Sequence, residues 1–326
     1  GGRPTIKNAE EDFREVFETI RKYYGMEHCR EITLEANPDD LTEAYAAMLQ
    51  NLPFNRISMG IQTFDDSTLK LLNRRHNAAQ AVNAVKHCRH AGFNNISIDL
   101  IYGLPGETDE RWKRDLQQAV SLNVEHISAY HLTYEEGTRI YELLQAHRIR
   151  EVDEESSVRF FSTLIDTLGS AGYEHYEISN FCRSDMYSRH NTSYWKGIPY
   201  LGCGPSAHSF NTDTREWNVA SLEKYIHAIE NNQRLSEQEQ SAQLLPHFSH
   251  IKILPASDCI TREERPHQQS QTHSDGAFPH FVQSPFSSSS LSQRQRELSA
   301  KEHIETRNIN KIRHNANNLF FILCLP

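Results

Sequence analysis

Four short apolar segments with one shared pattern constrain the fold more than any other feature of the sequence. They are EITLEAN (31–37), RISMGIQ (56–62), NISIDLI (95–101) and HISAYHL (126–132). Because side chains alternate between the two faces of a strand, each segment places apolar side chains on one face and small or polar ones on the other. This pattern predicts strands of a parallel sheet whose apolar face packs on helices.

Helical periodicity fills the intervals between these strands. The predicted helices cover 9–24, 40–52, 66–72, 78–91, 107–122 and 154–171. Asp40, followed by Glu43 three residues later, is typical of a capping box and predicts the start of the second helix. The fold class is therefore α/β, and the strand pattern favours a partial parallel (β/α) barrel with its polar face inward. An open doubly wound sheet is the alternative.

The shared pattern also predicts which polar residues lie level with one another. We expect one layer of the barrel interior to contain Glu35, Gly60, Asp99 and Tyr130, and the layer above it to contain Asn37 and Gln62. These positions lie toward the carboxyl ends of the strands, where barrel enzymes place their active sites. The alternative is that each polar residue simply ends its own strand. Agreement among four strands favours a polar cavity.

Composition excludes some classes of protein. The net charge is −9 and the pI about 6.1, whereas a nucleic-acid binder normally carries a basic face. The first residues lack the apolar core of a signal peptide, and the longest apolar run, LFFILCLP, is too short to span a membrane. The six cysteines form no CxxC pair. We therefore expect a cytoplasmic protein without nucleic-acid partners or an integral membrane segment.

Two groups of residues could carry chemistry. Two carboxylates, an amide and a guanidinium around one cavity mouth would suit a zwitterionic amino acid, and the candidates are Glu35, Gln62, Arg74 and Asp99. The alternative makes Arg74 part of a solvated pair with Arg75. The second group is RHNTSYWKG (189–197), which has neither helical nor strand periodicity and places His190 beside aromatic residues. A neutral imidazole is a common axial ligand of heme iron, and the alternative is a structural histidine in a tight loop.

Three further residues are weaker candidates. His87 and His90 have helical spacing around Cys88, but no third ligand is evident, so we interpret them as ordinary helix-surface residues. Cys203 lies between two glycines without an evident base that could activate it.

Six motifs, in order, resemble the HemW group of radical S-adenosylmethionine proteins, which are relatives of oxygen-independent coproporphyrinogen III oxidase. The motifs are GGRPT, EANP, GIQTF, LNRRH, IDLIYGLPGET and HNTSYW, and they span about residues 1–235. The resemblance implies a partial (β/α) barrel. It also implies that S-adenosylmethionine contacts Gly1, Gly2, Glu35, Gln62, Arg74 and Asp99, with its amino group near Glu35 and the glycines and its carboxylate at Arg74.

The same resemblance implies a heme site. The HNxxYW motif of the HemW group is matched by His190, Asn191, Tyr194 and Trp195, which makes His190 the first candidate ligand of heme iron. His208, at the end of GCGPSAH, is the second candidate. Aromatic side chains would give the flat macrocycle an apolar surface.

The chain also departs from the family pattern. Radical S-adenosylmethionine proteins hold a [4Fe–4S] cluster through a CxxxCxxC motif, which the resemblance places upstream of GGRPT. The cysteines at 29, 88, 182, 203, 259 and 324 do not form it, so the 4Fe–4S cysteines are absent from this chain. After residue 240 periodicity disappears and tryptophan and tyrosine no longer occur.

These observations predict three segments and rank three functions. We expect a partial barrel lacking its first strand and cluster loop over 1–175, a heme- or substrate-facing region over 176–240, and an atypical tail, disordered or out of frame, over 241–326. The first function is a heme chaperone that binds heme and S-adenosylmethionine and delivers heme to acceptor proteins, with an electron donor if the cluster is present. Coproporphyrinogen III oxidase, acting by oxidative decarboxylation, is the alternative. The second alternative is an inactive truncated product. No residue is assigned a catalytic role.

Overall fold

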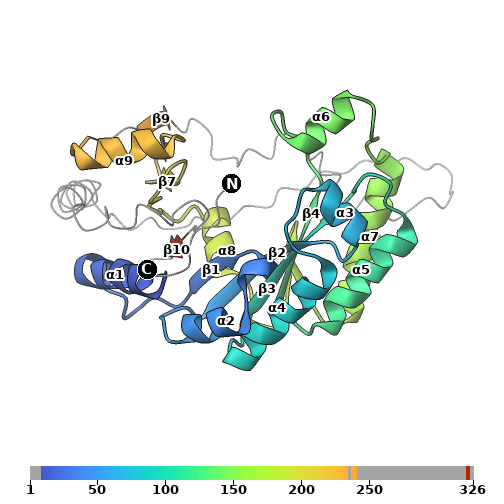
Figure 1. Cartoon of the computed structure of the whole chain (residues 1–326), viewed down its shortest axis with the longest axis horizontal. Helices are drawn as coiled ribbons and strands as arrows, with labels where there is room; N and C mark the ends of the chain where they lie inside the picture. Colours follow the sequence, from blue (N-terminus) through green and yellow to red (C-terminus); the bar gives the residue numbers. More distant parts are fainter. Residues whose placement is uncertain (1–8, 234–235, 241–320, 324–326) are drawn as a thin grey trace, which may run out of the picture. The chain divides into compact units, whose positions relative to one another are not determined.

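A sheet with a parallel core and antiparallel edge strands forms the centre of the protein. The computed structural model describes residues 9–233, 236–240 and 321–323. Its largest sheet has the strand order β10-β1-β2-β3-β4-β6-β5 (Figure 1). The four predicted strands are β1 (Ile32–Ala36), β2 (Arg56–Gln62), β3 (Ile96–Tyr102) and β4 (His126–His131), which are parallel neighbours in chain order.

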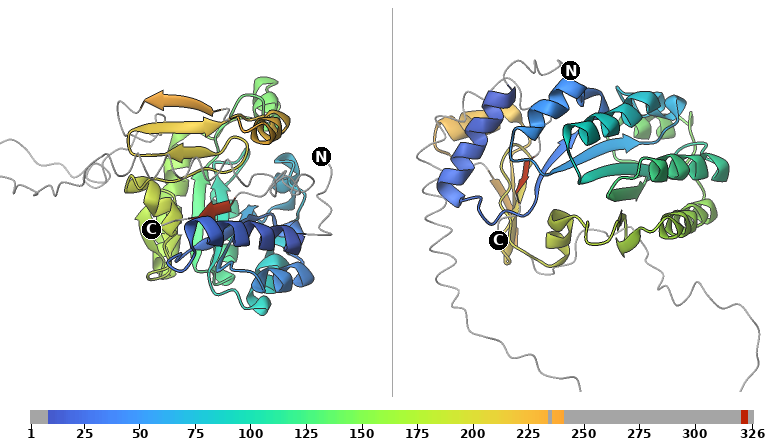
Figure 2. Two further views of the ribbon diagram at one scale, coloured as in Figure 1. Left: turned by 90° about the vertical axis from the view of Figure 1, so that its left-hand side faces the viewer. Right: turned by 90° about the horizontal axis from the view of Figure 1, so that it is seen from below.

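Helices connect these strands along one face of the sheet. They are α2 (Glu43–Gln50), α3 (Asp66–Leu71), α4 (Ala78–Ala91) and α5 (Asp109–Ser121). The views in Figure 2 agree with Figure 1 that α2, α4 and α5 cover the same face. A doubly wound sheet has helices on both faces and a reversal of strand order between its halves. The doubly wound alternative is therefore wrong, and the half-barrel prediction is confirmed.

The remaining helices of this half are α1 (Ala9–Tyr24), α6 (Arg139–Gln145) and α7 (Glu154–Ser170). Helices α1 and α4 have the predicted bounds, whereas α2 begins three residues later than predicted. The capping-box interpretation of Asp40 is wrong, because Thr42 caps α2 by accepting a hydrogen bond from the backbone N–H of Tyr45. Asp40 instead ends the 3₁₀ turn η2 (Pro38–Asp40) and pairs with Arg75.

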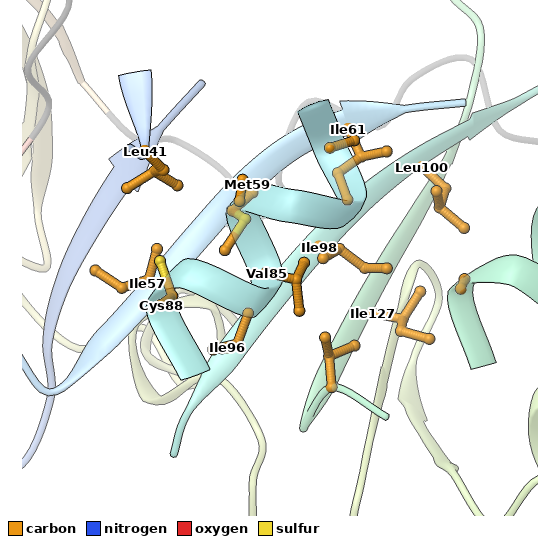
Figure 3. Close-up of a cluster of buried hydrophobic side chains, with 14 of the residues drawn as sticks. Leu41, Ile57, Met59, Ile61, Val85, Cys88, Ile96, Ile98, Leu100 and Ile127 are labelled. Carbon is orange, nitrogen blue, oxygen red and sulfur yellow. The ribbon is translucent and has the colours of Figure 1, made fainter. Parts of the chain in front are cut away.

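The apolar face of the sheet packs on α4, as predicted. Figure 3 shows Ile57 and Met59 of β2 and Ile96 and Ile98 of β3 among the side chains of this helix. These four side chains are completely buried, as is Cys88 of α4. Each buried aliphatic side chain contributes roughly 1.5–3 kcal/mol to folding, so this layer stabilises the sheet and leaves the opposite face available for polar residues.

The predicted layers of polar residues are partly wrong. Gly60 does lie level with Asp99, but Glu35 lies level with Ser58 and Asp99 with Ser128. Tyr130 pairs with Ile101, two residues further along β3. Strands of a barrel-like sheet tilt, and the tilt staggers the register between neighbours. Aligning the four segments by their sequence pattern ignored that stagger.

Shorter elements follow the parallel strands. The hairpin of β5 (Glu174–Glu177) and β6 (Asn180–Cys182) continues the sheet, with β6 antiparallel to β4. A second sheet contains β7 (His208–Phe210), β8 (Thr214–Asn218) and β9 (Ser236–Gln240), and α9 (Leu222–Glu230) precedes β9.

Two predictions concern the second half of the chain. The segment RHNTSYWKG has neither helical nor strand periodicity, yet Arg189–Trp195 forms the helix α8, so the alternative of a tight loop around His190 is wrong. Of the predicted tail over 241–326, only β10 (Phe321–Leu323) is described, and it pairs antiparallel with β1. The rest of that tail lies outside the described residues.

Candidate functional site

The polar face of the sheet and the start of α8 form one cavity. Its lining residues come from β1, β2, β3, β4 and α8, and they are Thr33, Glu35, Arg56, Ser58, Asp99, Ser128, Tyr130, Ser188, His190 and Asn191. The two groups predicted from the sequence meet in part, since Glu35 and Asp99 share this cavity with His190 and Asn191. Gln62 and Arg74 of the first group are not among its lining residues.

Arg74 is held at the carboxyl end of β2. Its Nη2 donates hydrogen bonds to Asn37 Oδ1 at 2.9 Å and to the carbonyl oxygen of Gly60 at 2.8 Å. A Cβ at Gly60 would lie 2.6 Å from Nε2 of Gln62 and 3.1 Å from Nη2 of Arg74, so a larger residue there would displace the ends of these side chains. Arg74 is thus not half of a solvated pair, although Arg75 is an exposed residue bound to Asp39 and Asp40.

The carboxylates of the cavity are shifted toward the neutral form. Burial, and then the neighbouring charge of Glu35, raise the pKa of Asp99 to about 6, against a hydrogen bond with Ser128 that lowers it. Partial desolvation also raises the pKa of Glu35, and the charge of Arg56 opposes this shift. A cationic group placed between the two carboxylates would relieve both shifts. The cavity is therefore suited to the ammonium group of a ligand.

Helix α8 is anchored to the sheet at its N-terminus. The carboxylate of Glu31 accepts hydrogen bonds from the backbone N–H groups of Arg189 at 2.9 Å and His190 at 3.2 Å. The hydroxyl of Ser188 caps the helix by accepting from the N–H of Asn191 at 3.3 Å. A carboxylate at this end also favours the helix dipole. Glu31 fixes where His190 lies relative to β1.

A chain of buried hydrogen bonds also holds the N-terminus of α8. The Tyr176 hydroxyl accepts from the N–H of Ser188 at 3.2 Å and lies 2.8 Å from Nε2 of His126, whose Nδ1 is 2.8 Å from Ser97 Oγ. Local sequence patterns do not predict these hydrogen bonds or the role of Glu31, because the bonded residues are up to 159 positions apart along the chain. The available signal was a polar residue at the start of β1 and β4.

His190 is a half-buried, neutral imidazole. Desolvation, and then the charge of Arg56, lower the pKa of His190 to about 4. Its Nε2 lies 2.7 Å from the Tyr194 hydroxyl, and the two rings pack edge to face with centroids 4.6 Å apart. A neutral imidazole can offer a lone pair to a metal ion.

Exposed apolar and aromatic side chains surround α8 and the segment after it. Tyr194, Trp195, Ile198 and Leu201 are each between 38% and 48% exposed. The ring of Tyr200 packs edge to face on Tyr194 with centroids 4.9 Å apart. We call Tyr194, Trp195, Ile198 and Leu201 the α8 patch. Exposed apolar residues this close along the chain are candidates for a binding surface.

The other predicted residues lie elsewhere. His208 is an exposed residue of β7 whose ring packs near Trp217, and it is not among the residues that line the cavity. His87 is partly buried, and its Nδ1 lies 2.9 Å from the carbonyl oxygen of Leu41. Gly1 and Gly2 lie outside the described residues.

The described residues do not fit an iron–sulfur cluster. The described cysteines, Cys29, Cys88, Cys182 and Cys203, lie in separate parts of the chain and form no CxxxCxxC motif. Within the described ranges, no three His, Cys, Asp or Glu side chains come close enough together to hold a metal ion. No step of chemistry through a cluster can be derived from these residues.

Known proteins resemble this chain in sequence and fold. Residues 1–119 match the model of the radical SAM superfamily. Heme chaperone HemW of Lactococcus lactis is 33% identical over 238 residues, which cover 73% of this chain and 62% of that protein. HemW of Bacillus subtilis is 35% identical over 230 residues, covering 70% of this chain and 60% of that protein. The chain thus spans about three fifths of the length of these relatives.

A solved structure shares the fold. Coproporphyrinogen III oxidase HemN from Escherichia coli superposes with a TM-score of 0.59 at 23% identity, covering 73% of this chain and 57% of that chain. At this level of identity the likeness concerns the fold alone. Among the described residues, none of the helices has the length and apolar character that a membrane span requires.

Proposed function

On the premise that this chain is a radical SAM protein of the HemW type, we propose that it binds heme at α8 and S-adenosylmethionine beside Glu35 and Arg74. In this proposal the bound heme is delivered to acceptor proteins. One observation carries the proposal: His190, held neutral, lines a polar cavity and begins the helix that bears the α8 patch. Heme needs both a neutral ligand for iron and an apolar surface for the macrocycle.

The polar end of the cavity supports the S-adenosylmethionine part of the proposal. Asp99 and Glu35 would receive the ammonium group, and the guanidinium of Arg74 would receive the carboxylate. In radical SAM proteins a reduced cluster supplies the electron that cleaves this cofactor, and the electron donor remains a predicted partner.

Chaperone activity is favoured over coproporphyrinogen oxidation. The HNTSYW segment that bears the heme candidates is complete, and sequence relatives at 33% and 35% identity are named heme chaperones. Glu35, Arg74 and Asp99 do not separate the two functions, because both require S-adenosylmethionine. The boundaries at residues 175 and 240 and a cytoplasmic location remain predictions.

Titration of the full chain with hemin tests the proposal. We expect a saturable Soret shift for the unaltered protein and a loss of affinity of tenfold or more in His190→Ala, which removes the iron ligand. His208→Ala is the matched control and should bind hemin normally, since His208 lies outside the cavity lining. Unchanged binding and an unchanged Soret band in His190→Ala would remove His190 from the ligand role. Turnover of coproporphyrinogen III would instead favour the oxidase.

A further inference from the structure

A buried cation without a partner lies in the cavity. Arg56 is the first residue of β2, is only 5% exposed, and lines the cavity with Glu35 and His190. Among the described residues Arg56 takes part in no ion pair, and its Nε has no hydrogen-bond partner. A buried charge is costly unless a counter-ion and hydrogen bonds compensate it.

Thr33, on the neighbouring strand, is a second buried polar residue whose side chain has no hydrogen-bond partner. Thr33 lies opposite Arg56 in the register of β1 and β2, is 4% exposed, and also lines the cavity. Its hydroxyl oxygen has no hydrogen-bond partner either. Two adjacent strands thus offer a guanidinium and a hydroxyl to the same space. Both groups can donate hydrogen bonds to an anion.

Arg56 lies near His190, the first candidate ligand of heme iron. Both Arg56 and His190 line the same cavity. Arg56 therefore acts on the cavity from the side of α8, whereas Arg74 is bonded to Asn37 and Gly60. The two arginines are separate in function, because only Arg74 is already held by protein acceptors.

From these contacts we infer that Arg56 and Thr33 form a carboxylate-binding subsite for a propionate group of the tetrapyrrole. This inference rests on the proposed function, since it names the residues that receive the acidic edge of a heme bound at His190. A guanidinium matches a carboxylate with two parallel N–H···O bonds. S-Adenosylmethionine also carries a carboxylate, so the test must distinguish these two sources.

Esterifying the propionates provides the test. Hemin and hemin dimethyl ester are titrated against the full chain and against Arg56→Met, which keeps an unbranched side chain without the charge. The unaltered protein should prefer hemin over the ester by about tenfold or more, as expected for charged hydrogen bonds. Arg56→Met should bind the ester normally and lose that preference. Arg75→Met, which removes an exposed arginine bound to Asp39 and Asp40, is the control and should keep it.

The ratio of the two affinities separates the possible failures. A misfolded variant loses hemin and ester equally, and Arg56→Lys then repeats the test with the charge retained but the bidentate geometry removed. An unchanged preference for hemin in Arg56→Met overturns the inference while the proposed function stands. A selective loss of S-adenosylhomocysteine binding in Arg56→Met would reassign Arg56 to the amino-acid carboxylate. If the unaltered protein binds neither porphyrin, the proposed function fails, and the propionate subsite with it.

Discussion

Asp99 shows at the residue scale how a candidate site differs from a structural core. It lies level with Gly60 and Ser128, is partly buried, and borders the cavity beside Glu35. Its neighbour Ile98 points to the opposite face and is completely buried. Ile98 packs against α4, whereas the next residue, Asp99, holds a carboxylate in an environment that disfavours its charged form. Such a cost is expected where a residue serves a ligand.

The first prediction follows from the pKa of Asp99, which is about 6 in the folded protein against an ordinary value of 3.8. Between these values the folded protein binds more protons than the unfolded chain, so the free energy of unfolding falls as pH rises through this window. Asp99→Asn removes the penalty. We expect this variant to be more stable at about pH 7.5, by at most about 3 kcal/mol for roughly two pKa units, and less because water screens a partly buried group.

Urea denaturation at about pH 7.5 and pH 4.5 measures this effect. The gain should be largest at the higher pH and about a third as large at the lower one, which is only slightly above the ordinary pKa of 3.8 that Asp99 has in the unfolded chain. Asp166→Asn, on the exposed side of α7, is the control and should change the free energy of unfolding little at either pH. Equal stabilisation of Asp99→Asn at both pH values would contradict the assigned cause.

At the scale of elements, local sequence patterns predicted the helices and strands whose formation depends on residues close along the chain. The alternation of RISMGIQ and the spacing of Ala78–Ala91 match β2 and α4 at both ends. Helix α8 was missed because its N-terminus is completed by Glu31 and Tyr176, which are remote in sequence. Arg56 was missed for a similar reason, since an arginine at the first position of a strand is usually solvated. Register and cavity lining depend on strand tilt, which no single segment encodes.

The second prediction concerns the N-terminus of α8. Ser188→Ala removes the side-chain cap of α8 and should cost about 1 kcal/mol of local stability. Amide hydrogen exchange in α8 should become roughly fivefold faster, and hemin affinity should fall because His190 is less well held. Ser221 caps α9 in the same way, so Ser221→Ala is a matched control that should loosen α9 alone. Similar losses of hemin affinity in both variants would show a general rather than a local effect.

At the scale of the whole molecule, one face of the sheet packs against helices and the other lines the candidate site. The face toward α4 is apolar and completely buried around Ile57 and Ile98, and the face toward α8 is polar and open at Tyr130. The proposed ligands meet only on the second face, where Glu35 and Arg56 bring opposite charges to one cavity. Binding of either ligand must therefore alter the electrostatic field that the other experiences.

The sign of this coupling is the last prediction. The carboxylates of Glu35 and Asp99 repel an anionic propionate at Arg56, and an ammonium group placed against them would cancel that repulsion. We expect saturating S-adenosylhomocysteine to tighten hemin binding several-fold, and hemin to tighten S-adenosylhomocysteine by the same factor, because such coupling is reciprocal. Calorimetric titrations in both orders measure the two factors. Methylthioadenosine, which lacks the amino-acid group, should leave hemin affinity unchanged, and an equal effect from it would show that the ammonium is not the cause.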